Sequence, residues 1–184
     1  MRVVGGTYRG KKIIAPDSLK TRPTADRARE SLFNILNSWL LKQGKTWSEI
    51  SFADVFSGTG AIGIEALSRG AKEVFCFEND REALRCLRQN TNGMERINIV
   101  SGDALNPLVH SAVSIIFMDA PYGKGLWQES LNQFNQKGWI DDETLIIIET
   151  DKKLNEMLPA GYELLQERSA GRNVFLFAKK QKED

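Results

Sequence analysis

Four carboxylates follow short apolar segments of the chain, and the chemistry of carboxylate oxygens suggests what they could bind. These residues are Asp54, Glu78, Asp103 and Asp119. A carboxylate accepts hydrogen bonds, so Glu78 could accept both hydroxyls of a ribose and Asp103 could accept the amino group of an adenine. Asp54 could meet a cationic amino-acid group directly or through water. The set therefore suits a nucleoside that also carries a positive charge.

A glycine-rich segment, DVFSGTGAIG at residues 54–63, begins with the first of these carboxylates. Gly58, Gly60 and Gly63 have the G-x-G-x-x-G spacing, and Glu78 follows Gly58 by twenty positions, which is typical of dinucleotide-binding enzymes. An NAD-dependent oxidoreductase is therefore one hypothesis. Asp54 opposes it, because a carboxylate four residues before the first glycine would repel a pyrophosphate. We favour a nucleoside without phosphate groups.

The segment DAPY at residues 119–122 brings three kinds of binding group together at the end of an apolar run. Asp119 supplies a carboxylate, Ala120 a backbone carbonyl beside Pro121, and Tyr122 an aromatic ring. Together they could surround one small planar group. The alternative is a proline–glycine turn that only ends a strand. Because three other carboxylates are expected at the same edge, we interpret the segment as a binding site.

The elements that would position these residues alternate between strand and helix. Apolar runs predict strands at residues 52–56, 73–78, 97–103, 114–123 and 144–150, and helical spacing predicts helices at 60–69, 80–90 and 126–134. Nearly continuous apolar strands separated by helices indicate a parallel sheet covered on both faces. In such a sheet ligands bind beyond the carboxyl ends of the strands, where the four carboxylates would meet.

The last two strand-like segments, at residues 162–171 and 172–180, leave no room for a helix between them. We therefore predict an α/β fold whose mostly parallel, seven-stranded sheet ends in an antiparallel hairpin. A dehydrogenase would more usually continue with another helix and a parallel strand, so the hairpin also opposes the NAD hypothesis.

The N-terminal region differs from the rest in charge. Residues 1–29 hold eight Lys and Arg against two Asp, a net charge of +6, whereas residues 30–184 hold seventeen basic and twenty-two acidic residues, a net charge of −5. Residues 1–14 resemble a short hairpin around Gly5 and Gly6, and a helix with Thr24 as its N-cap is expected before Gly44. A basic segment on an acidic body suggests a polyanionic partner. A hairpin packed on the body, with its charges in solvent, is the alternative.

Bulk composition limits the class of protein. A chain of 184 residues with 41% hydrophobic and 27% charged residues fits a single globular domain. Its apolar runs are too short to span a bilayer, and the N-terminus lacks the apolar core of a signal peptide. Two cysteines without C-x-x-C spacing favour a reducing compartment. We expect a cytoplasmic protein that needs no metal, contacts no membrane and is a monomer.

The series DVFSGTG, FEND, GDA and DAPY, with the final hairpin, resembles the S-adenosylmethionine-dependent methyltransferases of Rossmann-like fold that modify exocyclic amines. The N-terminal segments VVGGTYRGKKI and RPTADRARESLFNIL narrow the resemblance. They are similar to the ribosomal RNA small-subunit methyltransferase D family of bacteria, which makes N2-methylguanine in 16S ribosomal RNA. The resemblance covers roughly residues 2–178.

The resemblance implies a class I methyltransferase domain at residues 24–184, preceded at residues 1–23 by a basic hairpin and loop that bind RNA. It implies ribosomal RNA or an assembling small subunit as partner, and S-adenosylhomocysteine as the product left by the cofactor. The implied cofactor-binding residues are Asp54, Phe56, Ser57, Gly58, Thr59 and Gly60 for the methionine part, Glu78 for the ribose, and Asn79, Asp103 and Ala104 for the adenine.

The implied target-base site is Asp119, Ala120, Pro121 and Tyr122, and the implied RNA contacts are Tyr8, Arg9, Lys11, Lys12, Arg22 and Arg27. Ala120 departs from the family pattern, which has a proline there, although the backbone carbonyl is retained. Three alternatives stay open beside the dehydrogenase hypothesis. The accepting amine could be adenine N6 or a protein glutamine, or the chain could be a non-catalytic RNA-binding module, which the intact Asp119 and Glu78 oppose.

Overall fold

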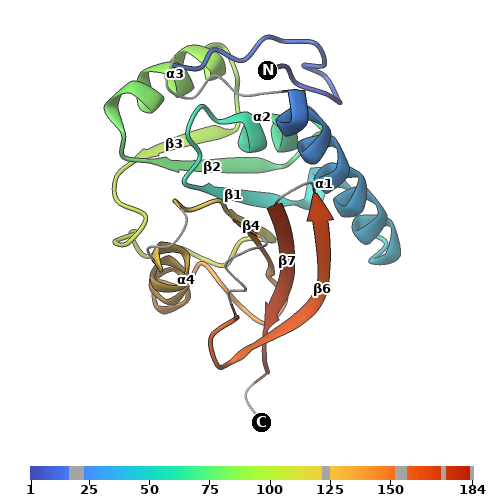
Figure 1. Ribbon diagram of the computed structural model, residues 1–184, viewed down its shortest axis with the longest axis vertical. Coiled ribbons are helices and arrows are strands. Elements are labelled where there is room, and N and C mark those ends of the chain that lie inside the picture. Colours follow the sequence, from blue (N-terminus) through green and yellow to red (C-terminus); the bar gives the residue numbers. More distant parts are fainter. Residues whose placement is uncertain (17–22, 122–124, 152–156, 171–172, 183–184) are drawn as a thin grey trace.

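The computed structural model describes residues 1–16, 23–121, 125–151, 157–170 and 173–182. Two predicted site residues, Arg22 and Tyr122, lie outside the described residues. A seven-stranded sheet with the order β3-β2-β1-β4-β5-β7-β6 forms the centre of the molecule (Figure 1). Its strands are β1 Ser51–Val55, β2 Glu73–Glu78, β3 Ile97–Ser101, β4 Ile115–Met118, β5 Leu145–Asp151, β6 Tyr162–Ala170 and β7 Asn173–Lys180.

The strand directions confirm the predicted fold class. Strands β1 to β5 pair in parallel, whereas β7 pairs antiparallel with both β5 and β6. The chain crosses over after β3 and continues on the other side of β1, so strand order reverses beside β1. A reversal of this kind leaves a crevice at the carboxyl ends of the strands, which is where open α/β sheets bind ligands.

Within the described residues four α-helices cover the sheet, and their apolar faces explain which side each one takes. They are α1 Pro23–Lys42, α2 Ala61–Ser68, α3 Arg81–Thr91 and α4 Leu126–Gln136, and a short 3-10 helix, η2 Trp47–Glu49, precedes β1. Helix α1 begins at Pro23, so the prediction that Thr24 caps it from outside is wrong. Proline suits the first helical position because its missing N–H has no partner there in any helix.

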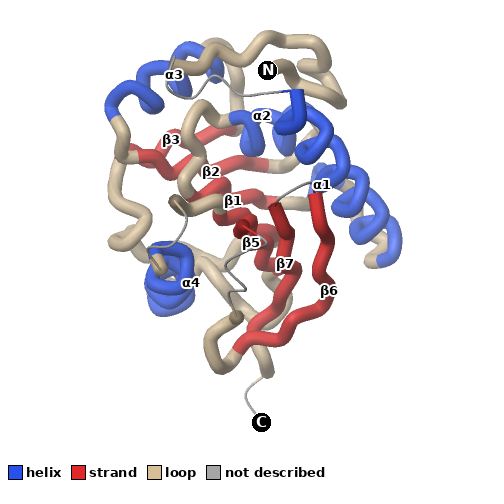
Figure 2. Tube along the Cα trace, viewed as in Figure 1, coloured by secondary structure: helices blue, strands red, loops and turns tan. Residues whose placement is uncertain are grey.

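Alternate strand residues divide the core into two layers. Phe52 of β1 and Ile147 of β5 face a cluster formed with α1, α2 and α3, whereas Val55 and Ile146 face a cluster formed with α4. Figures 1 and 2 show α2 and α3 on one side of the sheet and α4 on the other. Side chains alternate because successive residues of a strand point to opposite faces.

The N-terminal residues fold back on themselves, as predicted, but form a single antiparallel bridge, Arg2 to Lys12, instead of two full strands. The cause lies in their packing. Val3 and Ile13 are 2% and 3% exposed and pack on Ile64 of α2, so this segment belongs to the body of the protein. Its polar groups form hydrogen bonds to α2 and α3 as well as to each other.

Candidate active site

The register of the parallel strands brings the predicted carboxylates to one edge. Val55 of β1 lies beside Phe77 of β2 and Met118 of β4, so the following residues emerge together. Asp54 has the same orientation as Phe52, two residues earlier, and faces α2. The same alternation places Glu78 and Asp119 on this side of the sheet.

The glycine loop after β1 has a backbone that few sequences could adopt. Phe56 has φ of 68°, which is unusual for a bulky residue and occurs mostly at functional sites. Ser57 returns the chain to β2, where its N–H donates to the carbonyl of Phe77 at 2.8 Å. Gly58 has φ of 54°, and a Cβ placed on it would meet no atom within 4 Å. The backbone of Gly58 is therefore open to a ligand.

The other two glycines of the motif have packing roles. Gly60 has φ of 81°, and a Cβ there would lie 2.4 Å from Cδ1 of Leu87 in α3. A Cβ on Gly63 would lie 2.6 Å from Sγ of Cys76 in β2, so this glycine allows α2 to approach the sheet closely. The motif thus serves a tight turn and close helix packing, which any nucleoside-binding loop of this kind needs.

Glu78 holds the edge of the glycine loop. Its Oε2 accepts the N–H of Gly58 at 2.7 Å, and its Oε1 accepts the N–H groups of Asn79 and Asp80, both at 2.8 Å. A carboxylate has about four acceptor positions. One position is left, so binding two ribose hydroxyls would require one of these N–H bonds to give way.

Asp54 is buried, at 2% exposed, and its Oδ2 accepts the N–H of Gly63 at 2.8 Å. Burial raises the pKa of Asp54 from 3.8 to about 7, the Gly63 N–H lowers it, and the negative charge of Glu78 raises it further. A buried carboxylate with such a pKa gains most from a cationic ligand, because the ligand would favour its charged form.

Asp119 follows β4 directly, and solvent reaches its side chain, whereas Ala120 is buried against the α4 side of the core. Partial burial raises the pKa of Asp119 well above its ordinary value, and the charges of Glu149 and Asp54 raise it further. Pro121 is exposed beside it. Asp119 is therefore a stronger base than an ordinary surface carboxylate.

Glu149 is the residue that the sequence analysis missed. It follows Ile148 in β5, and Ile148 lies beside Met118, so Glu149 comes next to Asp119. Burial raises the pKa of Glu149, and a hydrogen bond from Nδ2 of Asn173 lowers it. A carboxylate ends this strand too, but it belongs to no motif, and only the register with β4 shows that it joins the others.

The residues predicted to contact adenine lie at the ends of β2 and β3. Asn79 and Asp103 are exposed, and Ala104 is buried in the α4-side cluster. One oxygen of Asp103 accepts the N–H of Leu105 at 2.9 Å, which leaves the other oxygen available. The structure therefore brings the predicted cofactor-binding residues of β1, β2 and β3 to one edge.

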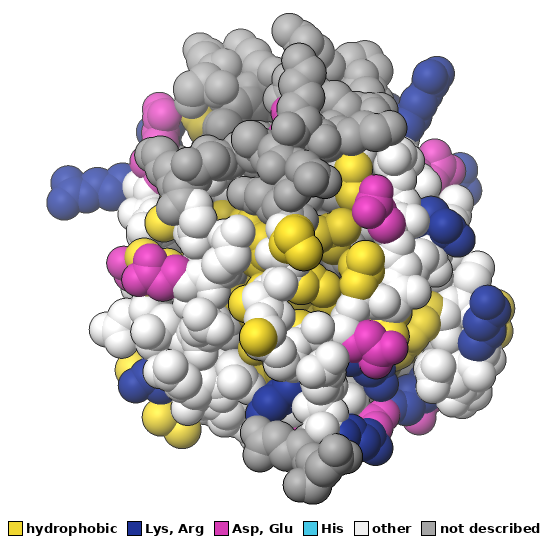
Figure 3. All heavy atoms as spheres, turned by 60° about the horizontal axis from the view of Figure 1, so that its bottom comes forward, with side chains coloured by type: hydrophobic (Ala, Val, Ile, Leu, Met, Phe, Trp, Pro, Cys, Tyr) yellow, Lys and Arg dark blue, Asp and Glu magenta, His cyan; other side chains and the backbone are white. Residues whose placement is uncertain are grey.

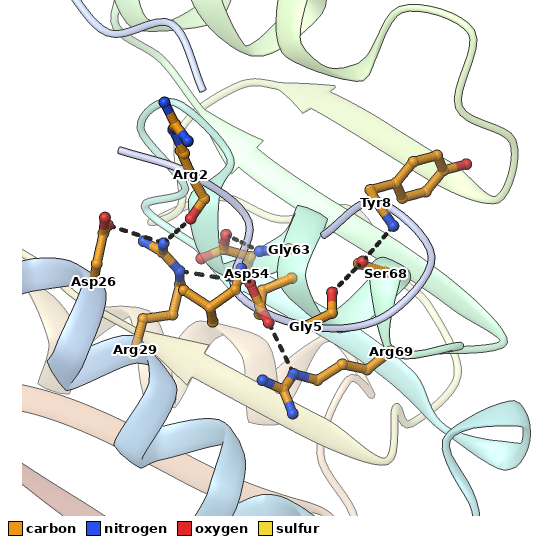
Figure 4. Close-up of polar contacts among 11 residues, drawn as sticks. Arg2, Gly5, Tyr8, Asp26, Arg29, Asp54, Gly63, Ser68 and Arg69 are labelled. Carbon is orange, nitrogen blue, oxygen red and sulfur yellow. Dashed lines mark hydrogen bonds and ion pairs between the residues drawn. The ribbon is translucent and has the colours of Figure 1, made fainter. Parts of the chain in front are cut away.

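The N-terminal segment is fastened to α2 by buried polar groups (Figure 4). Glu65 is 0% exposed, and its Oε2 accepts the N–H of Val4 at 2.8 Å. The hydroxyl of Ser68 accepts the N–H of Tyr8 at 2.8 Å and donates to the carbonyl of Gly5 at 2.5 Å. Arg29 of α1 donates to the carbonyl of Arg2. These contacts make the segment a fixed part of the site's surroundings.

The predicted RNA-binding residues are dispersed along this region. Arg9 and Lys12 are exposed, Lys11 is half-buried, and the ring of Tyr8 packs on the core, which limits its availability for stacking on a base. Arg27 is exposed on α1 and lines a hollow of about 600 Å³ between α1 and strand β6. Arg27 therefore lies at the hollow between α1 and β6, whose lining also includes Arg168.

Neither a metal-binding cluster nor a membrane-spanning helix occurs among the described residues. No three His, Cys, Asp or Glu side chains within the described ranges are grouped so that they could hold a metal ion. In the same part of the chain, no helix is both long enough and apolar enough to cross a membrane.

Comparison with known proteins agrees with the geometry. A family model described as conserved hypothetical protein 95 matches residues 1–179. A ribosomal RNA small subunit methyltransferase D of Escherichia coli is 34% identical over 180 residues, which cover 95% of this chain and 87% of the relative. The protein with the same name in Haemophilus influenzae is 28% identical, over 93% of this chain and 89% of the relative.

Solved structures show the same architecture. An Escherichia coli protein with the provisional description of a methyltransferase superposes with a TM-score of 0.83, at 31% identity, over 98% of both chains. A Haemophilus influenzae protein, provisionally described as a methylase, superposes with a TM-score of 0.77 over 98% of both chains. Because its identity is only 24%, this second likeness concerns the fold alone.

Proposed function

The chain belongs to the family described as conserved hypothetical protein 95 and also to the ribosomal RNA small subunit methyltransferase D family, and we propose its reaction from this membership. It is an rRNA methyltransferase. We propose that it transfers a methyl group from S-adenosylmethionine to the exocyclic N2 amine of a guanine in 16S ribosomal RNA. The observation that supports this most is the meeting of Asp54, Glu78 and Asp119 at one edge of the sheet, beside an open glycine loop.

The described residues fit S-adenosylmethionine in charge and shape. The open backbone at Gly58 leaves space that a side chain would fill, and the buried Asp54 suits a cationic amino-acid group. Glu78 and Asp103 offer acceptors for a ribose and an adenine amine. A pyrophosphate would meet three carboxylates here and be repelled, which opposes the NAD hypothesis. When bound, this cofactor supplies a methyl group on a positively charged sulfur.

Asp119 and Ala120 can compensate for the weak nucleophilicity of a guanine amine. The lone pair of a guanine amine is delocalised into the ring, so the nitrogen attacks poorly. The Asp119 carboxylate and the Ala120 carbonyl can each accept one N–H, which localises the lone pair and orients it. The resemblance to the family implies an aromatic ring that stacks on the base after the Asp119–Pro121 segment, and we assign this task to Tyr122.

The proton balance also involves Asp119. Converting –NH2 to –NH–CH3 releases one proton, and the raised pKa of Asp119 makes this carboxylate a suitable acceptor. Because the site lies at the surface of a compact domain, a guanine in a paired stem must leave its stack to reach it. The basic N-terminal residues 1–23 would hold the neighbouring phosphates.

Methyl transfer to small ribosomal subunits that lack guanine-N2 methylation tests this proposal. Labelled S-adenosylmethionine would be supplied, the RNA digested to nucleosides, and the labelled nucleoside identified. The wild-type protein should produce N2-methylguanosine. Asp119→Asn removes the charge but keeps the shape, and it should slow the reaction by about 10²–10⁴-fold.

Two controls make the result specific. Asp142→Asn removes a carboxylate from an exposed ion pair with Lys182 and should leave the rate unchanged. S-adenosylhomocysteine should raise the melting temperature of both variants, whereas NADH should not. Label in adenosine or in protein would contradict the guanine assignment, and no label despite cofactor binding would favour a non-catalytic RNA-binding module.

A further inference from the structure

Three arginines line the outer face of helix α3. Arg81, Arg85 and Arg88 are spaced at i, i+4 and i+7, so they lie on one side of the helix. All three are exposed, and the opposite side of the helix is buried in the core. Seven residues of α-helix extend roughly 10 Å, which is the length of this row. We call these three residues the arginine row.

The arginine row contributes nothing evident to the fold. None of the three side chains forms an ion pair or hydrogen bond with a residue in the described part of the chain. Neighbouring like charges on a helix repel each other, and Arg81 lies at the first helical position, where the helix dipole disfavours a cation. Arg88 differs because it lies in the last turn, where the helix dipole favours a cation. The row is also a cationic patch on a body, residues 30–184, whose net charge is −5.

Helix α3 is fixed between the N-terminal segment and the glycine loop. The side chain of Asn90 is buried, at 1% exposed, and its Oδ1 accepts the N–H of Ile14 at 2.8 Å. Its Nδ2 donates to the carbonyls of Ile14 and Thr59, at 2.9 and 3.0 Å. Figure 1 shows the N-terminal segment running beside α3. The arginine row is therefore held at a fixed distance from the candidate active site.

A hollow of about 300 Å³ joins the arginine row to the N-terminal segment. Its lining residues are Ile14, Ala15, Pro16, Glu82, Arg85, Cys86 and Gln89. Arg85 thus belongs both to the row and to the hollow. On the face shown in Figure 3, by contrast, the described Lys and Arg side chains are scattered and alternate with Asp and Glu around a hydrophobic centre. That face lacks a patch of one sign among its described side chains.

We propose that the arginine row is an RNA-binding surface, which contacts phosphates of the strand that flanks the target guanine. The proposal rests on the proposed function, because it takes ribosomal RNA as the substrate. Arg81 follows Glu78 by three residues and begins the surface at the site edge. Arg88 and the hollow beside Arg85 continue it to Ile14, which follows Lys11 and Lys12 in the chain. A phosphate backbone matches this surface because it carries regularly spaced negative charges.

Binding to 16S ribosomal RNA fragments, measured by fluorescence anisotropy at several salt concentrations, tests the proposal. The triple variant Arg81→Gln, Arg85→Gln, Arg88→Gln should weaken binding by roughly 10-fold or more at low salt. The slope of log K against log salt should fall by about 2, since each phosphate contact to a single strand contributes about 0.7. Affinity for S-adenosylhomocysteine should not change, and the melting temperature should not fall.

The matched control replaces Lys42, Lys45 and Lys72 by Gln. These side chains are exposed where the strands begin, at the opposite edge of the sheet from the site. Both triple variants change the net charge from +1 to −2, because each loses three positive charges. Only the arginine variant should lose RNA affinity. Replacing the three arginines by Lys should restore most of it, because lysine also neutralises phosphate.

Each outcome separates this proposal from the proposed function. Equal RNA affinity and salt slope for the arginine variant and wild type would overturn the arginine row while leaving methylation intact. Equal loss in both triple variants would show a general charge effect and also overturn it. If the arginine variant bound bare RNA normally but bound small subunits weakly, the partner would be a ribosomal protein. Failure of wild type to make N2-methylguanosine would instead contradict the proposed function.

Discussion

The buried carboxylate of Asp54 has a pH dependence whose sign can be derived. Its pKa in the folded protein, about 7, lies above its ordinary value of 3.8. The folded state therefore binds more protons than the unfolded state between these values, and stability falls as pH rises from about 4 to about 7. The protein gives up stability at neutral pH to keep an anion where a cationic ligand would bind.

Replacing Asp54 by Asn should therefore stabilise the free protein at pH 8. Asn keeps an oxygen for the Gly63 N–H but does not ionise, so the gain should reach up to about 4 kcal/mol. It should vanish below about pH 4. Urea denaturation at pH 4, 6 and 8 measures it, with Asp142→Asn as the control. Affinity for S-adenosylhomocysteine should fall in the same variant, and a stabilised variant with normal affinity would contradict the role of Asp54.

We expect Glu149 to influence the reaction through its neighbour Asp119, whose pKa it raises. Asp119 must be ionised to accept a proton, so the rate should fall as pH falls through its pKa. Replacing Glu149 by Gln removes a negative charge that raises this pKa, so the acidic limb of the pH–rate profile should move to lower pH. The rate of methyl transfer between pH 5 and 9 measures the shift.

Glu163→Gln, on the exposed strand β6, provides the control for Glu149. This variant should leave the acidic limb where it is in wild type. If the acidic limb of the pH–rate profile also stays in place in the Glu149 variant, Glu149 does not influence Asp119.

At this scale the sequence predicts residue types better than it predicts their surroundings. The carboxylates of DVFSGTG, FEND and DAPY are recognisable because each belongs to a motif. Glu149 ends an ordinary apolar strand and gains its meaning only from pairing with β4. The three N–H groups on Glu78 depend likewise on how the loop folds back.

Among the elements, the junction of the glycine loop and α3 is closely packed. Gly60 has a positive φ and lies against Leu87, which is 0% exposed. Gly60→Ala should destabilise the protein by about 2 kcal/mol or more, because it adds a clash to the strain of a left-handed residue. Gly44→Ala is the control, since Gly44 has φ of 65° but a Cβ there meets no atom within 4 Å.

Urea denaturation of both glycine variants separates the cost of backbone strain from the cost of the side-chain clash. Gly44→Ala reports the backbone strain alone, and the difference between the variants reports the contact with Leu87. Equal destabilisation would show that Leu87 moves aside freely. The affinity of Gly60→Ala for S-adenosylhomocysteine should also fall, because the loop that begins α2 would shift.

Regular elements were predictable because their patterns are local. The strands and the helices α2 to α4 agree with their apolar spacing to within two residues, except that β4 ends at Met118 whereas the predicted strand continued to residue 123. The final hairpin follows from the short connection. The start of α1 and the N-terminal hairpin were less predictable. Residues 1–14 bond partly to each other and partly to α2 and α3, and such distant partners leave no local pattern.

For the molecule as a whole, the basic N-terminal region and the acidic body meet at a buried cluster of charges. Glu65 of α2 accepts a hydrogen bond from Nε of Arg69 at 2.9 Å and lies 3.7 Å from Nε of Arg29. Arg29 is 4% exposed and also pairs with Asp26 at 3.0 Å. One carboxylate thus joins the first helix, the second helix and the N-terminal segment. The sequence shows the charge asymmetry, but only the structure shows that Glu65 pairs with both Arg29 and Arg69.

Replacing Glu65 by Gln tests whether this cluster holds the molecule together. The variant leaves Arg29 and Arg69 without their shared negative partner, and removing one member of a buried ion pair costs about 3–5 kcal/mol. Glu143→Gln breaks an exposed pair with Lys179 and should cost less than about 1 kcal/mol.

Hydrogen exchange should increase at Val4 and Tyr8 in the Glu65 variant, because the N-terminal segment loses its anchor on α2. RNA affinity should then fall even though no phosphate-binding residue has changed. Normal exchange at those amides with an equal loss of stability would show that Glu65 stabilises the helices alone, and that the N-terminal segment is held by Ser68 and Asn90.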